Sequence, residues 1–180
     1  MFQVRFHARA GQGSKSAAQI LVEAANMEGK FIQAFPEYGP ERMGAPMLAF
    51  AKISDTEIRE YESVYNPDAV VVIDETLVCD SVVKGAKGTV IINTKKNAAE
   101  LKKELKYNNL HTIDASEISQ KYTGGKGANI VLLGALLKLN KIVKIENAEK
   151  IIESHFLKKI GKEKTDGNIK ALREGYNLIR

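Results

Sequence analysis

Hydrophobic and polar positions along this chain follow two rhythms, which predict strands alternating with helices. Residues 2–6 alternate apolar and polar side chains, as a half-buried strand does. Residues 69–73 and 89–92 are continuously apolar and mostly β-branched, a pattern typical of strands covered on both faces. Further strands are expected at 31–35 and 47–53, and a shorter one at 111–113.

Apolar residues at helical spacing predict a helix over 14–28, which we expect Ser14 or Ser16 to cap. Further helices are expected at 98–105, after Asp114, and at 128–139, 147–157 and 166–179. This order predicts an α/β fold, a three-layer α/β/α arrangement with a mostly parallel, mixed central sheet. The strands within 31–53 would make the sheet mixed. One domain over residues 1–180 is the expectation for this length.

Residues 35–46 carry three prolines, two glycines, two glutamates and an arginine between apolar runs. Proline fixes φ and removes a donor, whereas glycine allows unusual backbone angles. The segment is therefore predicted to be a stiff, charged loop and a docking or ligand surface. Glu37, Glu41 and Arg42 could have acid–base or electrostatic roles, or could form an ion pair within the loop.

A second glycine-bearing turn, Gly11-Gln12-Gly13, follows the first strand and precedes the first helix. Backbone N–H groups at such a helix N-terminus favour anions, and Gln12, Ser14 and Lys15 could add phosphate contacts. The dinucleotide and P-loop fingerprints are incomplete here. A tight β–α turn without a ligand is the equally open alternative.

Asp74, Asn93 and Asp114 each follow a predicted strand. Ligands collect at the carboxyl ends of strands in open α/β sheets. The alternative is that each residue only caps the helix or turn after it.

Composition excludes several classes of function. The net charge is +5, with −3 in residues 1–94 and +8 in the rest, but the lysines alternate with glutamates and predict solvated helix faces rather than a nucleic-acid surface. No apolar run approaches the roughly 20 residues of a membrane span, and the start predicts a strand rather than a signal peptide. We therefore expect a cytoplasmic protein with no membrane contact.

Cys79, the single cysteine, is expected to be a buried, inert thiol. It cannot form an iron–sulfur cage, and the three histidines lack metal spacing.

The chain resembles the gamma subunits of 2-oxoacid:ferredoxin oxidoreductases, especially the pyruvate-type (pyruvate synthase) members. The resemblance is carried by residues 5–13 and by the long Pro/Gly motif at 33–46, which is the more specific of the two. It extends through Asn66-Pro67-Asp68, Asp74-Glu75-Thr76-Leu77, Ile92-Asn93-Thr94, Asp114-Ala115, Asn129, Leu133-Gly134-Ala135 and Arg173-Glu174-Gly175-Tyr176.

The resemblance implies one subunit of a complex that converts pyruvate, coenzyme A and oxidised ferredoxin to acetyl-CoA, carbon dioxide and reduced ferredoxin. The complex would use thiamine diphosphate, magnesium and [4Fe-4S] clusters, held mainly by alpha, beta and delta subunits, and would meet ferredoxin as a whole. This chain would bind no cofactor by itself, carry no catalytic residue and be inactive alone. It would support the active site and coenzyme A access.

Two sets of site residues follow from this interpretation. The first faces coenzyme A phosphates or a neighbouring subunit, and consists of Arg9, Gly11, Gln12, Gly13, Ser14 and Lys15. The second packs against the thiamine-bearing subunits, and consists of Glu37, Tyr38, Gly39, Glu41, Arg42 and Gly44. Gamma subunits for branched-chain 2-ketoacids or 2-oxoglutarate are alternatives for the substrate. A nucleotide-binding module and a free-standing assembly scaffold are the alternatives outside this enzyme family.

Overall fold

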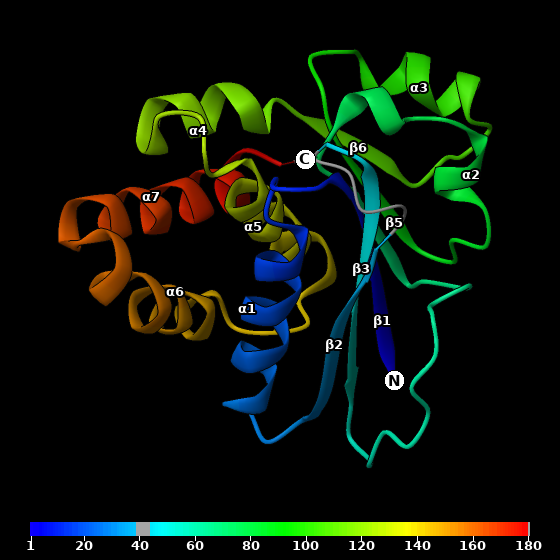
Figure 1. Cartoon of the computed structure of the whole chain (residues 1–180). Coiled ribbons are helices and arrows are strands. Elements are labelled where there is room, and N and C mark those ends of the chain that lie inside the picture. Colours follow the sequence, from blue (N-terminus) through cyan, green and yellow to red (C-terminus); the bar gives the residue numbers. More distant parts are fainter. Residues whose placement is uncertain (39–43, 180) are drawn as a thin grey trace.

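The structure, a computed structural model, describes residues 1–38 and 44–179. Among these residues a six-stranded sheet has the order β2-β3-β1-β4-β5-β6 (Figure 1). Strands β1, β4, β5 and β6 are parallel, and β3 is antiparallel to both of its neighbours, so the predicted mixed sheet is confirmed. The strands are β1 (Phe2–Arg9), β2 (Phe31–Tyr38), β3 (Pro46–Ser54), β4 (Ala69–Val72), β5 (Thr89–Asn93) and β6 (Leu110–Ile113).

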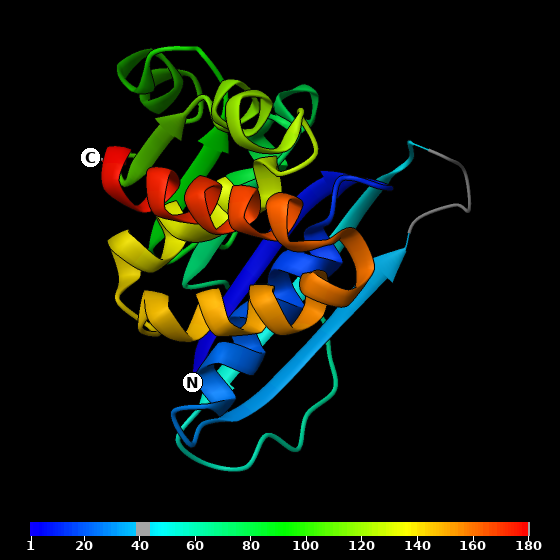
Figure 2. The same cartoon turned by 90° about the vertical axis from the view of Figure 1, so that its left-hand side faces the viewer.

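Helices cover both faces of this sheet, which confirms the three-layer prediction. On one face α1 (Ser14–Asn26) and α5 (Ala128–Asn140) pack directly against the strands. Helices α6 (Ile145–Ile160) and α7 (Lys162–Leu178) pack outside them, and α4 (Ala115–Thr123) contacts α5 and α7 (Figure 2). The other face carries the 3₁₀ helix η1 (Glu75–Leu77), α2 (Asp80–Val83) and α3 (Ala98–Glu104).

The hydrophobic core explains the two unbroken apolar patterns of the sequence. Every residue of β4 and β5 is buried, because helices lie over both faces of these strands. Helix α5 is apolar on nearly all sides because it lies between the sheet and α7. At the crossing of α5 and α7, an added Cβ on Gly134 would overlap the Leu172 carbonyl, and one on Gly175 would overlap the Val131 carbonyl. These glycines let the two backbones approach closely.

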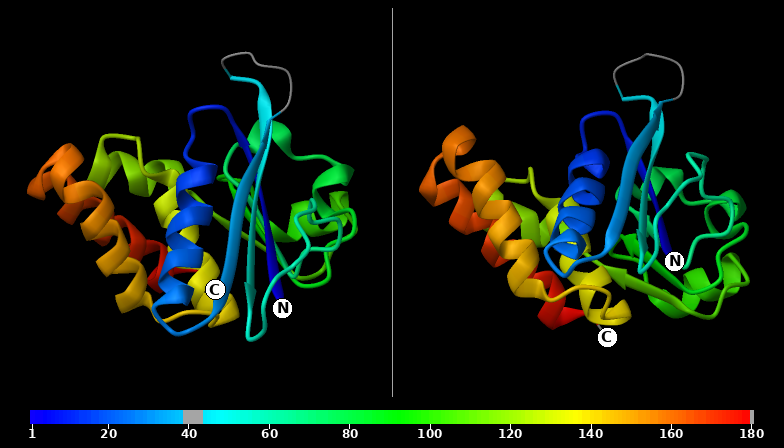
Figure 3. Two further views of the ribbon diagram at one scale, coloured as in Figure 1. Left: turned by 60° about the horizontal axis from the view of Figure 1, so that its bottom comes forward. Right: turned by 90° about the horizontal axis from the view of Figure 1, so that it is seen from below.

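The prediction of a loop starting at residue 35 was wrong at both ends of the segment. Residues 35–38 continue β2 and pair with residues 47–50 of β3, which itself begins at Pro46. Proline is tolerated at position 36 because β2 is an edge strand, where one row of N–H groups has no partner strand. The C-terminal end of β2 and the N-terminal end of β3 project beyond the helices, at the same end of the molecule as the β1–α1 turn (Figure 3).

Cys79 also departs from expectation, because its side chain is exposed rather than buried. It precedes α2, a helix of only four residues, in which Val82 is the buried residue. The thiol lies 2.9 Å from the Ser81 hydroxyl. Val82 and its neighbours Leu77, Val78 and Val83 pack against the core on this face of the sheet, whereas Cys79 itself is exposed.

A buried arginine is a polar feature of the second face of the sheet. Arg5, only 8% exposed, donates to the carbonyl oxygens of Val82 (2.9 Å) and Lys84 (2.8 Å), and at 3.4 Å to those of Val64 and Tyr65. Its Nε also donates to Nε2 of His7 at 3.1 Å. Burial and the neighbouring Arg5 charge lower the pKa of His7 to about 4, so His7 is neutral near pH 7. Arg5 thereby fixes the segment before β4 and the end of α2 onto β1.

Candidate functional site

The chain leaves the neighbouring parallel strands β1 and β4 toward opposite faces of the sheet. Strand β1 continues into α1 on one face, whereas β4 continues into η1 and α2 on the other. Ligands in open α/β sheets usually bind where the chain changes direction in this way, at the carboxyl ends of the two strands, a place termed the crevice. The predicted turn at residues 11–13 and the polar residue Asp74 both lie there.

Gln12 ties the two strand ends together. Its Oε1 accepts from the backbone N–H of Arg9 at 2.8 Å, and its Nε2 donates to Oδ2 of Asp74 at 2.5 Å. The Gln12 backbone N–H also donates to the Arg9 carbonyl at 3.1 Å. With both amide atoms used inside the protein, Gln12 shapes the turn. Whether Gln12 also contacts a phosphate stays a prediction.

Asp74 connects this turn to Thr76 and Arg9. Its Oδ1 accepts from the Thr76 backbone N–H (3.0 Å) and hydroxyl (2.6 Å), and its Oδ2 lies 3.6 Å from Arg9 Nε. Partial burial raises the pKa of Asp74, but the hydrogen bonds from Thr76 and Gln12 and the Arg9 charge outweigh it, so the net pKa lies below the ordinary value. Asp74 is therefore an ionised carboxylate at neutral pH that holds the crevice together.

Arg9 joins the turn to the hairpin. Its guanidinium donates to the Thr76 hydroxyl from Nε (3.1 Å) and Nη2 (2.8 Å), and from Nη1 to the Gly44 carbonyl at 3.0 Å. The backbone N–H of Ala10 donates to the Ala45 carbonyl, also at 3.0 Å. The structure thus brings together the two motifs that the sequence separates by about thirty positions.

The start of α1 differs from the predicted serine cap. Gly13, with φ of 80°, is the N-cap residue, and no side chain caps the helix. Asn129 Nδ2 donates to the Gly13 carbonyl at 3.0 Å, and a Cβ at position 13 would lie 2.6 Å from that nitrogen. Only glycine therefore fits this position without displacing Asn129.

Ser14 occupies the first turn of α1 and is 1% exposed, yet its Oγ has no hydrogen-bond partner within the described part of the chain. The first N–H groups of a helix also lack partners inside it, and they carry partial positive charge. Lys15 follows with an exposed side chain. The turn therefore presents donors that an anionic group could satisfy.

The second predicted set lies on the hairpin. Glu37 is exposed and accepts a hydrogen bond from the Ser63 hydroxyl, and the Tyr38 backbone ends β2. The Gly44 carbonyl binds Arg9, as described above. Gly39, Glu41 and Arg42 lie outside the described residues, so the proposed ion pair within the loop stays a prediction.

The three polar residues after the strands all act as caps or cross-links. Asp114 accepts from the Glu117 N–H at 2.9 Å, and Asp74 caps η1. Asn93 donates to the Ile73 carbonyl (2.8 Å) and accepts from the Ser116 N–H (3.1 Å). Asp74 alone of these three also reaches the glycine turn. Thr76 and Asn129 were not among the predicted site residues, and their roles arise from contacts with chain segments 67 and 116 positions away.

Residues 1–38 and 44–179 contain no cluster of three or more side chains suited to a metal ion. No helix within the same ranges is both long and apolar enough to cross a membrane.

The described residues define a three-layer α/β protein in which a glycine turn is hydrogen-bonded to the end of a β-hairpin. The profile of the pyruvate ferredoxin/flavodoxin oxidoreductase family matches residues 3–178, and the chain belongs to this family. This confirms the family that the sequence motifs indicated.

Individual relatives agree with this assignment. Pyruvate synthase subunit PorC of Thermotoga maritima is 46% identical over 99% of this chain and 95% of that protein. The common gamma subunit of the pyruvate and ketoisovalerate oxidoreductases of Pyrococcus furiosus is 42% identical over 98% of this chain and 96% of that protein. The crystal structure of the pyruvate oxidoreductase subunit PORC of Thermotoga maritima has a TM-score of 0.89 at 43% identity, covering 99% of this chain and 97% of that one.

Proposed function

We propose that this chain is the gamma subunit of a pyruvate:ferredoxin oxidoreductase. The complex would combine pyruvate, coenzyme A and oxidised ferredoxin into acetyl-CoA, carbon dioxide and reduced ferredoxin. The relatives named pyruvate synthase support this proposal, since one of them is 46% identical over nearly the whole of both chains. Thiamine diphosphate, magnesium and iron–sulfur clusters would be held by the alpha, beta and delta subunits.

The gamma chain's own part is to receive coenzyme A at the start of α1. The observation that carries this proposal is the buried, unpartnered hydroxyl of Ser14 in the first turn of that helix. An unsatisfied buried hydroxyl costs about 1–3 kcal/mol, so its retention is best explained by a partner that arrives with the ligand. Phosphate oxygens fit, because the free N–H groups of the turn favour an anion at the same place. Lys15 would add its charge, whereas Arg9 and Gln12 hold the turn in shape.

The hairpin would dock on the thiamine-bearing subunits through Glu37, Tyr38, Gly39, Glu41, Arg42 and Gly44. Its support is geometric, since the ends of β2 and β3 project beyond the helices (Figure 3). The bonds from Arg9 to Gly44 and from Ala10 to Ala45 fix this hairpin to the glycine turn. Docking would therefore place the coenzyme A turn beside the partner's active site.

Choice of the 2-oxoacid would belong to the other subunits. A single gamma subunit is named as common to pyruvate and ketoisovalerate oxidoreductases in Pyrococcus furiosus, which favours this division of labour. Activity on branched-chain 2-ketoacids is therefore the second candidate. Turnover of the purified complex with pyruvate, 2-ketoisovalerate and 2-oxoglutarate distinguishes the three substrates.

Ser14→Ala tests the coenzyme A site in the intact complex. We expect the KM for coenzyme A to rise about tenfold, which corresponds to one hydrogen bond to a charged group, with kcat and the KM for pyruvate unchanged. The matched control is Ser16→Ala, which removes an exposed hydroxyl from the same turn. An unchanged KM for coenzyme A in Ser14→Ala would show that this turn does not contact the substrate, and the subunit assignment would stand without it.

A further inference from the structure

Two pairs of exposed apolar side chains lie on opposite sides of the molecule. The first pair belongs to the irregular segment between β3 and β4, where Tyr61 and Tyr65 are 73% and 72% exposed. The second pair lies at the junction of α6 and α7, where Leu157 and Ile160 are 42% and 40% exposed. In Figure 1 the β3–β4 segment runs along the lower right of the molecule, and the α6–α7 junction is at the far left.

The backbone that carries the two tyrosines is fixed to the second face of the sheet. The Lys52 ammonium donates to the Glu60 carbonyl at 3.2 Å, and Val64 is buried against the phenylalanines of β2 and β3. The Tyr61 ring stacks on Phe35 with a centroid distance of 4.5 Å and an interplanar angle of 31°. The rings are therefore presented to solvent by an ordered segment, which lowers the entropy that a binding partner must remove.

The surface around these tyrosines carries unpaired negative charge. Glu60 and Glu62 flank Tyr61 in sequence, and both side chains are exposed. Neither carboxylate has a cation within ion-pair distance in the described part of the chain, whereas Glu57 is paired with Arg59. Residues 57–65, here named the tyrosine segment, thus form an aromatic surface with two free carboxylates.

The α6–α7 junction carries unpaired positive charge beside its aliphatic pair. Leu157 and Ile160 are three residues apart on α6 and so share one helix face. Lys158 and Lys159 lie between them in sequence, Lys162 begins α7, and all three side chains are exposed. Within residues 1–38 and 44–179, no carboxylate pairs with any of these lysines. Residues 157–162 are here named the lysine corner.

The two surfaces complement each other in charge. Protein interfaces usually have apolar or aromatic side chains at their centre and polar groups at their rim, and each surface has this composition. Lysines that were only solvated would not need the exposed aliphatic pair beside them. An anionic lipid surface would attract the lysine corner but would repel the tyrosine segment, whereas a second copy of this chain engages both surfaces.

We propose that the tyrosine segment of one copy of this chain binds the lysine corner of a second copy. Because the surfaces lie on opposite sides, one pair of copies makes one such contact and leaves one surface of each kind free. The association is therefore head-to-tail and continues into rings or short rows. This inference goes beyond the proposed function, because neither surface includes the groups assigned to coenzyme A or to the hairpin docking site.

Sedimentation velocity of the full chain over a range of protein concentrations tests the association. At an ionic strength of 0.1 M, we expect the weight-average sedimentation coefficient to rise with concentration. At 1 M the Debye length falls from about 10 Å to about 3 Å, so the dissociation constant should rise about tenfold or more. A chain that remains monomeric at every concentration at 0.1 M overturns the proposal.

Charge reversal identifies the two surfaces. Lys158→Glu with Lys159→Glu makes the corner acidic, and Glu60→Lys with Glu62→Lys makes the segment basic. Each double variant alone should associate at least about tenfold more weakly than the wild type, because like charges then face each other. An equimolar mixture of the two should associate again, because each surface then meets one of opposite charge. A mixture that stays monomeric overturns the pairing of these two surfaces.

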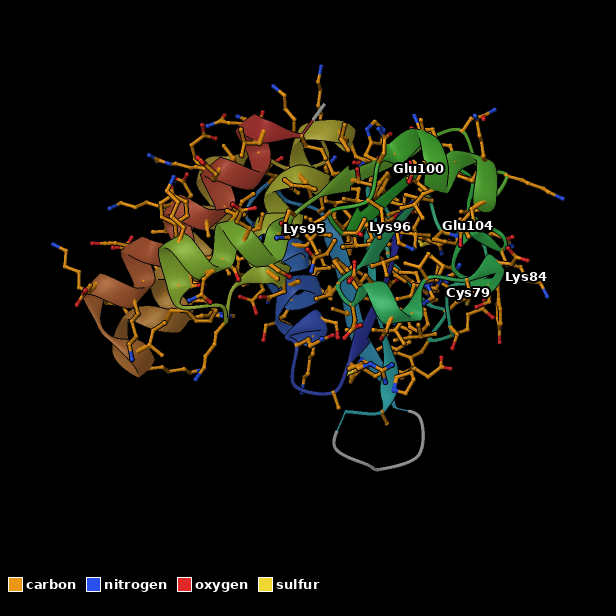
Figure 4. The ribbon with its side chains drawn as sticks, turned by 90° about the horizontal axis from the view of Figure 1, so that it is seen from above. Cys79, Lys84, Lys95, Lys96, Glu100 and Glu104 are labelled. Atoms are coloured by element: carbon orange, nitrogen blue, oxygen red, sulfur yellow. The ribbon has the colours of Figure 1, made fainter. Side chains whose placement is uncertain are left out.

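Lys103→Glu with Lys106→Glu is the matched control, because it changes the net charge by the same amount at two exposed lysines. These lysines lie in and just after α3, the helix on which Figure 4 labels Glu100 and Glu104, away from the α6–α7 junction. The control should associate as the wild type does. Equal loss in the control would show that net charge alone drives association and would overturn the proposal.

Vesicles that contain phosphatidylserine test the other occupant. No binding by the full chain is the expected result. If the chain is monomeric in solution but binds these vesicles, and loses that binding in Lys158→Glu with Lys159→Glu, the lysine corner meets an anionic lipid surface and the proposal is overturned.

Discussion

His7 should make the folded chain sensitive to mild acid. Its imidazole accepts a hydrogen bond from the Arg5 guanidinium, and burial together with that neighbouring charge lowers its pKa from 6.5 to about 4. The unfolded chain therefore binds a proton at His7 more readily than the folded chain does. The stabilisation is present above pH 6.5 and is lost as the pH falls from 6.5 toward 4.

The size of this effect follows from the two pKa values. For a group that titrates at 6.5 in the unfolded chain and at about 4 in the folded chain, linkage gives a loss of about 2 kcal/mol in the free energy of unfolding between pH 7 and pH 5. The full difference, reached below pH 4, is about 3 kcal/mol. Either value is a large share of the roughly 5–15 kcal/mol that stabilises a typical domain.

His7→Gln isolates this contribution. A glutamine oxygen can still accept from Arg5, but it does not titrate, so the variant should lack the histidine part of the pH dependence. Urea unfolding of the full chain at pH 7, 6 and 5, followed by circular dichroism, gives the free energy for both proteins. We expect the wild type to lose about 2 kcal/mol more than the variant across this range. Parallel pH dependences for the two proteins would refute the assignment of His7 as a neutral, partly buried histidine.

Three further outcomes test the packing. Arg5→Met should destabilise the chain by about 3 kcal/mol in urea unfolding, because it leaves several buried carbonyl groups without a donor; a loss below 1 kcal/mol would contradict its role as a clamp. Gly175→Ala should lower the free energy of unfolding by roughly 1–3 kcal/mol, because the new methyl overlaps the Val131 carbonyl of α5. A Tm equal to that of the wild type would contradict this close approach. Cys79 should react with a thiol reagent in the folded chain as fast as in urea, and protection in the folded state would contradict its exposure.

The sequence predicted those strands and helices whose pattern of apolar residues directly shows which of their faces are buried. Strands β4 and β5 were found because both faces are covered, and α5 because its long apolar run is unbroken. The length of β2 was not predictable in this way. Whether Pro36 ends a strand depends on its place at the sheet edge, and that place is set by the order of all the strands.

In the candidate site, too, local sequence predicted the features that depend on neighbouring residues and missed those that depend on distant ones. Local sequence located the glycine turn, but it assigned the cap to serine because serine is a favoured N-cap residue. The structure instead has Gly13 as the N-cap residue, in the αL conformation. Asn129, 116 positions further along the chain, donates to its carbonyl. Gln12 was interpreted as a ligand contact because it lies in a turn that favours anions, and its bond to Asp74, 62 positions away, was not predictable from local sequence.

The hydrogen bonds of Arg9 explain why an arginine suits this position in the crevice. A planar guanidinium can reach two directions at once, and here it donates to Thr76 on one side and to the Gly44 carbonyl on the other. Thr76 in turn is held by Asp74, which also holds Gln12. The hairpin, the glycine turn and the start of η1 are thus linked by consecutive hydrogen bonds. A partner subunit that fixes the hairpin would therefore also fix the groups that we propose to receive coenzyme A.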